Sequence, residues 1–491
     1  MESSIKKTCY ELKDHGVLHH PGVEDPWNLN VFKKKFHVEI ICRGEDSDTM
    51  EFDMINLDCS FSNAIRRILV SEVPSLAIER VYITQNTSIM PDEVMCHRLG
   101  LIPLAVDPKY FLFPTRKPPS SDDISGFDSK EHLVYDMHVG FTQANRDSQS
   151  KLDRDKTQDG TLPVAQYLPV YSSDLKWVPL PGQEDHFNIN NPPMPVSSTI
   201  LINKLALGDE IEARCVAVKG IGRDHAKFSP VAAAYYKFHP IIKLLRTIEG
   251  EQAVKLQKSF ASGVIGINSK TGQAFVDNAR LDNGSREHMR HPEFRDTVFV
   301  GMDSSHCIFT VETIAPGTRP PSSLVRCALA VMISKCSHYL AVTETPGFGD
   351  QVEECKPVID VSEDNSESHV AQKNLLTQKI NRSQLNGREV GLEVTHVSPD
   401  KLRATFTFFG EDHTLGLALR YCILRDESVN FCGYCVPHPL EDMINFDIQM
   451  KRGSAIDALR NGLQCLRDCF QHIKQTFISA MKISRSTRKS S

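Results

Sequence analysis

Two stretches of this sequence decide the fold that we expect: Asp58-Cys59-Ser60-Phe61-Ser62-Asn63-Ala64-Ile65-Arg66 and Asp412-His413-Thr414-Leu415-Gly416-Leu417-Ala418-Leu419-Arg420. They share Asp, a hydroxyl residue, a large apolar residue, Ala, an aliphatic residue and Arg at the same offsets. In both, Asp and the hydroxyl residue stand just before an apolar helical pattern, where their oxygens can accept hydrogen bonds from the free N–H groups of a first turn. Each copy is therefore predicted to begin a capped helix.

The residues around the two copies follow one plan. Alternating apolar residues predict strands before each copy, at 36–40 and 50–54 in the first half and at 402–408 in the second. Each half ends in a predicted amphipathic helix, which begins near Ser322 in the first half and near Ser454 in the second. The first half has far more residues between its two helices, so we expect a separate domain to be inserted there.

Length and composition narrow the class of protein. The 491 residues allow about three domains, and 40% hydrophobic with 24% charged residues is an ordinary globular composition. A formal net charge of -6 argues against a protein that mainly neutralises phosphates, so any contact with nucleic acid is expected to be indirect. No apolar run reaches the roughly 18 residues of a bilayer span, and the polar start lacks a signal-peptide core, so we expect no membrane and a nucleocytoplasmic protein.

The expected fold class is α+β. Two related dimerisation units form an intramolecular pseudo-two-fold pair that buries their helices, with an inserted second domain in the first unit. The expected boundaries are an N-terminal extension (1–35), a first dimerisation domain in two segments (36–85 and 301–342), the inserted domain (86–300), an acidic flexible linker (343–387), a smaller dimerisation domain (388–482) and a basic tail (483–491).

The sequence offers little catalytic chemistry. It has no Walker loop, no Gly-x-Ser-x-Gly elbow and no His-Glu-x-x-His motif, so we expect a non-catalytic protein without a cofactor. Cys432, Cys435 and His438 have zinc-like spacing, but a structural zinc site needs four ligands. A metal-binding enzyme that uses these three residues is kept as an alternative from another functional class.

Longer motifs in the first half resemble the larger alpha-like subunit shared by eukaryotic RNA polymerases I and III. The motifs are Asn63-Ala64-Ile65-Arg66-Arg67-Ile68-Leu69, Glu72-Val73-Pro74, His97-Arg98-Leu99-Gly100-Leu101-Ile102-Pro103-Leu104 and Val218-Lys219-Gly220-Ile221-Gly222-Arg223-Asp224-His225-Ala226-Lys227-Phe228-Ser229-Pro230. In the second half, Asp412-His413-Thr414-Leu415-Gly416, Phe431-Cys432-Gly433-Tyr434 and Pro437-His438-Pro439 are similar to the smaller partner subunit, which is normally a separate polypeptide.

The resemblance implies a heterodimer that nucleates assembly and carries the two large catalytic subunits, here with both parts in one chain. It also implies small zinc-binding shared subunits as partners, rRNA, 5S rRNA and tRNA as products of the complex, and a place in the nucleus, including the nucleolus. The corresponding polymerase II pair is the alternative within the class. It is disfavoured because only Cys96 and Cys215 lie between Val81 and Val300, where the polymerase II counterpart carries a cysteine cluster.

Two sets of residues are expected to make contacts. The predicted dimerisation residues are Phe61, Ala64, Ile65, Arg66, Ile68, Leu69, Thr414, Leu415, Leu417, Leu419, Arg420 and Ile423. The resemblance implies large-subunit docking by Arg98, Lys219, Arg223, His225 and Lys227. A solvated helix face for the two equivalent arginines, and an ordinary basic surface loop for 219–227, are the simpler interpretations.

Overall fold

A computed structural model of the chain describes residues 9–13, 15–20, 27–43, 48–115, 126–144, 167–187, 192–345, 348, 383–385 and 388–489, and the structural statements below concern these residues. We call the described residues between 9 and 345 the first half and those between 383 and 489 the second half.

The first half is built on an antiparallel sheet in the order β2-β1-β14-β4-β3, with β11 also paired to β14. Its strands are β1 (Cys9–Lys13), β2 (Gly16–His20), β3 (His37–Arg43), β4 (Thr49–Ile55), β11 (Val231–Leu244) and β14 (Val298–Thr313). Its helices are α1 (Leu29–Lys35), α2 (Cys59–Ser71) and α7 (Pro321–Thr343). The expected N-terminal extension contributes two strands and a helix to this unit, and β1 pairs with β14 from Cys9 opposite Asp303 to Glu11 opposite Gly301.

The second half repeats this plan with a sheet in the order β15-β16-β17-β19-β18. Its strands are β15 (Ser383–Leu385), β16 (Arg388–Val397), β17 (Arg403–Phe409), β18 (Val429–Cys435) and β19 (Met443–Met450), and its helices are α9 (His413–Ile423) and α10 (Ala455–Lys489). Helix α10 continues to Lys489, through most of the segment expected to be a basic tail. Both predicted caps are confirmed, since Asp58 accepts from the N–H of Ser60 and Asp412 from that of Thr414.

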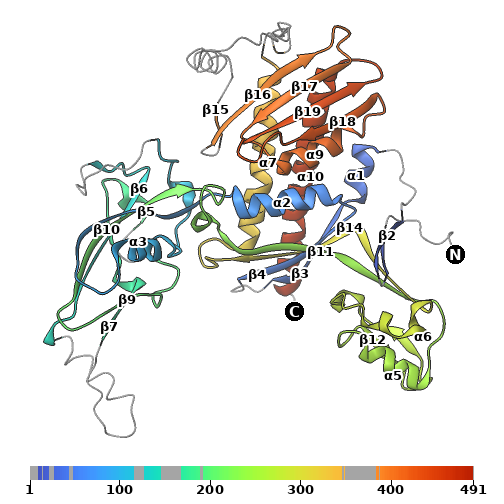
Figure 1. The fold of residues 1–491 in the computed structure, drawn as a ribbon, viewed down its shortest axis with the longest axis horizontal. Helices are drawn as coiled ribbons and strands as arrows, with labels where there is room; N and C mark the ends of the chain where they lie inside the picture. Colours follow the sequence, from blue (N-terminus) through green and yellow to red (C-terminus); the bar gives the residue numbers. More distant parts are fainter. Residues whose placement is uncertain are drawn as a thin grey trace, which may run out of the picture.

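The two long helices each contact both halves. Helix α7 contacts β4 and β14 of its own half and β16 of the other, whereas α10 contacts β17 and β19 of its own half and β3 of the other. Figure 1 shows α7 and α10 running between the two sheets with α2 crossing them. Residues from Phe36 to Leu340 and from Val390 to Met481 accordingly form one continuous core.

The burial of α7 explains its composition. Among the described residues, α7 is the one helix that is long and apolar enough to cross a membrane. However, 56% of its apolar stretch is buried inside the protein. Leu324, Leu329 and Met332 are fully enclosed. Its apolar surface is therefore used in the shared core.

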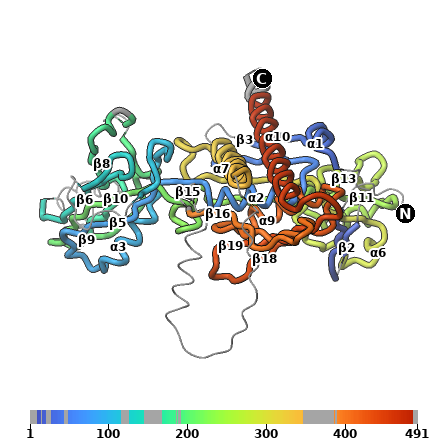
Figure 2. The backbone as a smooth tube through the Cα atoms, turned by 90° about the horizontal axis from the view of Figure 1, so that it is seen from above, coloured from blue at the N-terminus to red at the C-terminus, as the bar shows by residue number. Residues whose placement is uncertain are grey.

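Two modules leave the central sheet of the first half. The larger has its own core and contains α3 (Asp92–Gly100), β5 (Ser75–Asn86), β6 (His132–Gly140), β7 (Leu168–Tyr171), β8 (Lys176–Val178), β9 (Leu201–Leu205) and β10 (Glu210–Gly220). The smaller contains α5 (Gly250–Lys258), β12 (Ile265–Ile267), β13 (Ala274–Val276) and α6 (Pro292–Arg295). Short 3-10 turns lie at Pro108–Tyr110, Ser172–Asp174, Gln183–Asp185, Ala226–Phe228, Ala279–Leu281 and Glu287–Arg290. Both views place the two modules at opposite ends of the molecule (Figures 1 and 2).

This arrangement differs from the single insertion expected over 86–300. Strand β11 lies between the two modules and pairs with β14 from Val231 opposite Thr313 to Leu244 opposite Val298. The backbone of this segment is needed by the central sheet, so the chain returns to it between the modules. Most of the expected linker at 343–387 lies outside the described residues, although α7 extends to Thr343.

Candidate functional site: the seam between the two halves

The contact surface between the two halves, which we call the seam, has an apolar floor. Most of the predicted dimerisation residues lie on it and are buried: Phe61, Ala64, Ile65, Ile68 and Leu69 on α2, and Thr414, Leu415, Leu419 and Ile423 on α9. The ring centroid of Phe61 lies 5.5 Å from those of Tyr421 and Phe470 in the other half. Burial of these side chains contributes the non-directional part of the attraction between the halves.

The two final helices make reciprocal aromatic contacts across the seam. Tyr339 of α7 meets Phe408 of β17 edge to face, with centroids 5.0 Å apart. Phe477 of α10 meets Phe52 of β4 in the same way at 5.3 Å. Edge-to-face geometry is favoured by the ring quadrupoles, so these pairs fix orientation as well as burying area.

Three predicted dimerisation residues lie outside the buried core of the seam. Leu417 is 37% exposed and lines a cavity at the edge of the seam together with Asp58 and Tyr236 of the first half. Arg66 donates to Asn63 Oδ1 within its own helix at 2.9 Å, and Arg420 donates to the carbonyl of Cys432 within its own half at 3.1 Å. Both guanidinium groups therefore bond within their own half, although Arg420 also lines a cavity at the edge of the seam with Asp58 and Asn63.

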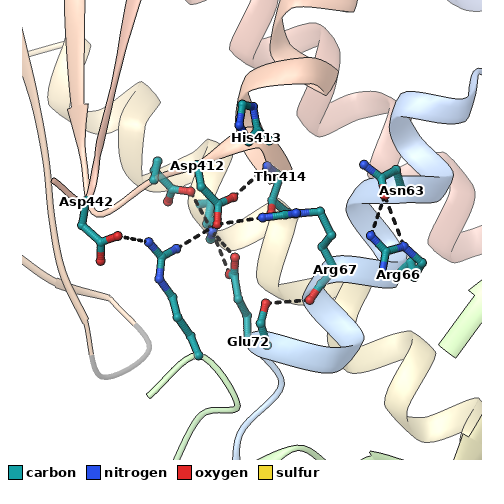
Figure 3. Close-up of polar contacts among 12 residues, drawn as sticks. Asn63, Arg66, Arg67, Glu72, Asp412, His413, Thr414 and Asp442 are labelled. Atoms are coloured by element: carbon teal, nitrogen blue, oxygen red, sulfur yellow. Dashed lines mark hydrogen bonds and ion pairs between the residues drawn. The ribbon is translucent and has the colours of Figure 1, made fainter. Parts of the chain in front are cut away.

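The neighbouring Arg67 makes the contact that was expected of Arg66 (Figure 3). Its Nε donates to Thr414 Oγ1 at 2.8 Å and its Nη2 donates to Asp412 Oδ2 at 3.1 Å. Asp412 Oδ1 meanwhile accepts from the N–H of Thr414 at 2.7 Å. One carboxylate therefore caps α9 and also binds the opposite half.

Burial by itself would raise the pKa of Asp412. Hydrogen bonds from Thr414 and the charges of Arg67 and Arg223 outweigh that effect and hold the pKa well below its usual range. Asp412 is therefore ionised throughout the neutral range.

A buried ion network lies beside this contact. Lys335 Nζ is 2.7 Å from Glu72 Oε2 and 2.8 Å from Glu411 Oε2, and Tyr339 donates to Glu411 Oε1 at 3.0 Å. The side chains of Lys335, Glu72 and Glu411 are at most 5% exposed. Burial alone would lower the pKa of Lys335, but the two carboxylates raise it, so the ammonium stays charged. Lys335 and Glu72 belong to the first half and Glu411 to the second, so the network joins the halves.

Arg223 also belongs to the seam, contrary to its expected role in docking another subunit. Its Nη1 donates to Asp412 Oδ2 at 3.0 Å, and its Nη2 donates to Asp442. The preceding Gly222 approaches α2 so closely that a Cβ there would lie 2.2 Å from the carbonyl oxygen of Val70. The glycine therefore permits the loop to sit against α2, and Arg223 reaches the second half from there.

The other predicted docking residues make hydrogen bonds within their own chain. Arg98 donates to the carbonyls of Leu201 and Ile202, and Lys219 donates to the carbonyl of Phe111 at 2.9 Å. Lys227 donates to the carbonyl of Ile78 at 2.9 Å and pairs with Glu79. His225 is exposed, and its Nδ1 accepts from the N–H of Lys227 at 3.1 Å, which caps the short turn at Ala226–Phe228. The basic side chains thus bind their own chain, because the loop and α3 are packed against neighbouring strands.

The alternative metal site is not assembled. Cys432 is buried at 1% exposure, whereas Cys435 and His438 are exposed, because residues 432 and 435 lie on opposite faces of β18. Burial also raises the pKa of Cys432 to about 12, so its thiol stays protonated. The described residues contain no group of three or more Cys, His, Asp or Glu side chains able to hold a metal ion.

Sequence reasoning missed the ionic residues of the seam. Lys335 is a single cation inside the most apolar part of α7, and an isolated charge in an apolar helix is a signal that the pattern contained. Arg67 was not recoverable in this way, since only the helix orientation decides which of two adjacent arginines faces the partner.

Comparison with known proteins gives the family. A model described as the RNA polymerase Rpb3/Rpb11 dimerisation domain matches residues 51–336, and a second model with the same description matches residues 403–476. The chain belongs to the Rpb3/Rpb11 dimerisation family. It thus contains two Rpb3/Rpb11 domains, and members of this alpha-like type are non-catalytic subunits of RNA polymerase.

Named relatives of this Rpb3/Rpb11 protein cover its first half. It is 39% identical over 323 residues to the DNA-directed RNA polymerases I and III subunit RPAC1 of Mus musculus, which spans 65% of this chain and 88% of the relative. The protein of the same name from Saccharomyces cerevisiae is 38% identical over 317 residues, or 64% of this chain and 90% of the relative. The Dictyostelium discoideum RNA polymerase II subunit rpb3 is 32% identical over 207 residues, which is 57% of that relative.

Proposed function

We propose that this chain is a fusion of the larger and smaller alpha-like subunits of RNA polymerases I and III, and that it acts as the assembly platform for their two large catalytic subunits. The observation that carries the proposal is the single core shared by the two Rpb3/Rpb11 domains. A dimerisation domain leaves its helix face exposed unless a second such domain covers it, and here the second domain lies in the same chain.

The proposed architecture is an intramolecular pseudo-two-fold pair. It is supported by the repeated order of strands, capped helix and final helix, and by the reciprocal contacts of α7 and α10 with the opposite sheets. We propose 36–73, together with β11 and the β14–α7 segment, as the first dimerisation unit, and 388–482 as the second. The modules at 75–228 and 245–297 are the proposed insertions.

The assignment to polymerases I and III, rather than to polymerase II, rests on a comparison within one organism. The Dictyostelium discoideum rpac1 subunit is 34% identical over 84% of its length, whereas the rpb3 subunit matches over 57% of its length at 32%. We propose from this that the complex lies in the nucleus, including the nucleolus. The proposed partners are the largest and second-largest subunits and the small zinc-binding shared subunits, with nucleic acid contacted only through the complex.

The docking proposal changes with the structure. Arg98, Lys219, Arg223 and Lys227 bind other segments of the chain, whereas the imidazole of His225 is exposed and bonds to the N–H of Lys227 in its own turn, so we propose His225 as the member of the set that contacts a large subunit.

Affinity purification of the tagged chain from nuclear extract, followed by mass spectrometry, tests the proposed function. The two largest subunits of polymerases I and III are expected among the co-purified proteins, and those of polymerase II are not. Recovery of the polymerase II large subunits in equal amount, or of no large subunit, would reject the assignment.

A further inference from the structure

The ion pairs across the seam are divided between the halves by charge, whereas Arg460 of the second half donates to the backbone carbonyl of Thr343. In the described part of the chain, the first half supplies the cations of this network and the second half supplies acids: Arg67, Arg223 and Lys335 face Glu411, Asp412 and Asp442. The first half adds one acid, Glu72, which Lys335 also binds. The first half thus presents a net positive surface to a second half that is negative.

The sequence repeat shows that this network occupies one side of the seam. At the position that corresponds to Glu411, the first half has Leu57, which is buried at 1% exposure. At the position that corresponds to Arg67, the second half has Tyr421, whose ring packs against Phe61 and under the guanidinium of Arg425. The repeat-related place is therefore apolar and aromatic.

This asymmetry matters for what else the second half could bind. The described buried residues of its long helix α10 carry no charge: Ala455, Ala458, Leu459, Gly462, Leu463, Leu466, Cys469, Phe470, Ile473, Phe477 and Met481. Arg460 and Arg467 are half-buried, and Arg460 donates to the carbonyl of Thr343. A second copy of this half in place of the first would bring that apolar face to Glu411, whose side chain is completely buried. It would also bring Tyr421 to Asp412 at the position where the first half has Arg67.

We propose that the one-sided charge network is a specificity device, through which the second half accepts a first half and rejects another copy of itself. The inference rests on the proposed pairing of the halves. Its physical basis is that a buried carboxylate without a cation or hydrogen-bond donor is strongly unfavourable, so self-pairing is penalised more than correct pairing is favoured. Apolar burial alone does not discriminate in this way, because both halves offer apolar faces.

The test uses the whole chain. Two full-length copies with different tags on their second halves, each with a protease site introduced at Glu353, are co-expressed, cleaved and captured through one tag. The readout is the ratio of first half to foreign second half in the captured material. For the wild type this ratio is expected to be high. The double variant Glu411→Gln/Asp412→Asn keeps the side-chain shapes and the helix cap. In this variant the ratio of first half to foreign second half should fall about tenfold or more.

Control and companion variants make the result decisive. Glu427→Gln neutralises an exposed acid of the same half away from the network and should behave as the wild type. If circular dichroism shows that the double variant is unfolded, Lys335→Met decides instead, since loss of its cation should also lower the ratio.

The specificity proposal is overturned if the folded double variant gives the same ratio as the wild type. If the double variant is unfolded, an unchanged ratio in Lys335→Met overturns it. A wild type whose own halves separate after cleavage overturns the proposed pairing instead, so the two failures are distinguishable.

Discussion

Lys335 is the residue on which the polar part of the seam depends. It is 3% exposed and binds carboxylates from both halves. A buried ion pair that loses one partner leaves an uncompensated charge, which typically costs about 3–5 kcal/mol. Glu72 and Glu411 would then lie close together without a cation.

We therefore predict that Lys335→Met lowers the free energy of unfolding by about 3–5 kcal/mol. Urea denaturation followed by circular dichroism measures this. Lys482→Met, at an exposed position of α10, is the matched control and should change stability by less than about 0.5 kcal/mol. Equal stability of the two variants would show that Lys335 is dispensable in the seam.

Asp412 gives the seam a dependence on pH. Because its pKa in the folded protein is depressed, it contributes stability above its unfolded pKa of about 3.9, and that contribution is lost as the pH falls toward the folded value. Asp412→Asn keeps a capping side chain but loses the charge.

The wild type should accordingly exceed Asp412→Asn in stability by a constant amount from about pH 5 to pH 7, and the difference should shrink below about pH 4. Urea titrations at pH 7, 5 and 3 check this. A difference that is as large at pH 3 as at pH 7 would contradict the assignment of the ion pairs to Asp412.

At the scale of elements, α9 has one buried face and one exposed face. Leu415 is completely buried, whereas Leu417, two residues later, is 37% exposed. Gly462 allows α10 to approach α9, since a Cβ there would lie 2.4 Å from Ile423 Cγ1. The packing of α9 should therefore be sensitive to a polar substitution at Leu415 and much less sensitive to one at Leu417.

The same substitution at the two leucines should separate these faces. Leu415→Asp places an unpaired carboxylate in the core and is expected to cost about 3 kcal/mol or more, with loss of pairing. Leu417→Asp should cost no more than about 1 kcal/mol. Thermal unfolding of both variants provides the comparison, and wild-type stability for Leu415→Asp would mean that α9 faces solvent on both sides.

At the scale of the whole molecule, the halves are held by a common core in addition to their covalent connection. Side chains from both sequence ranges belong to one cluster, and ion pairs join them at Arg67, Arg223 and Lys335. The connection along the chain raises the effective concentration of one half for the other without supplying contacts.

A chain cleaved at a protease site introduced at Glu353 should therefore keep its halves together. At micromolar concentration the fragments are expected to elute as one species from a sizing column. Arg223→Glu, which places a third carboxylate beside Asp412 and Asp442, should weaken this association, whereas His225→Glu at the exposed loop tip should not. Separation of the wild-type fragments would show that the connection, and not the seam, holds the protein together.

The sequence by itself determined the elements of each half. Asp58 and Asp412 mark helix starts because an N-cap is a local interaction, and the strands and final helices follow from apolar periodicity along the chain. It also predicted most of the buried dimerisation residues, because burial on one helix face is a periodic property. These features depend on neighbours a few residues apart.

Tertiary structure alone decided which polar residues meet and where the modules leave the sheet. Arg67, and not Arg66, reaches Asp412, because helix orientation selects between adjacent residues. Arg223 binds the second half because the loop lies against α2, and β11 divides the expected insertion because it pairs with β14 in the central sheet. Such contacts join residues far apart in the sequence, and a directional ion pair requires a relative placement that no local pattern encodes.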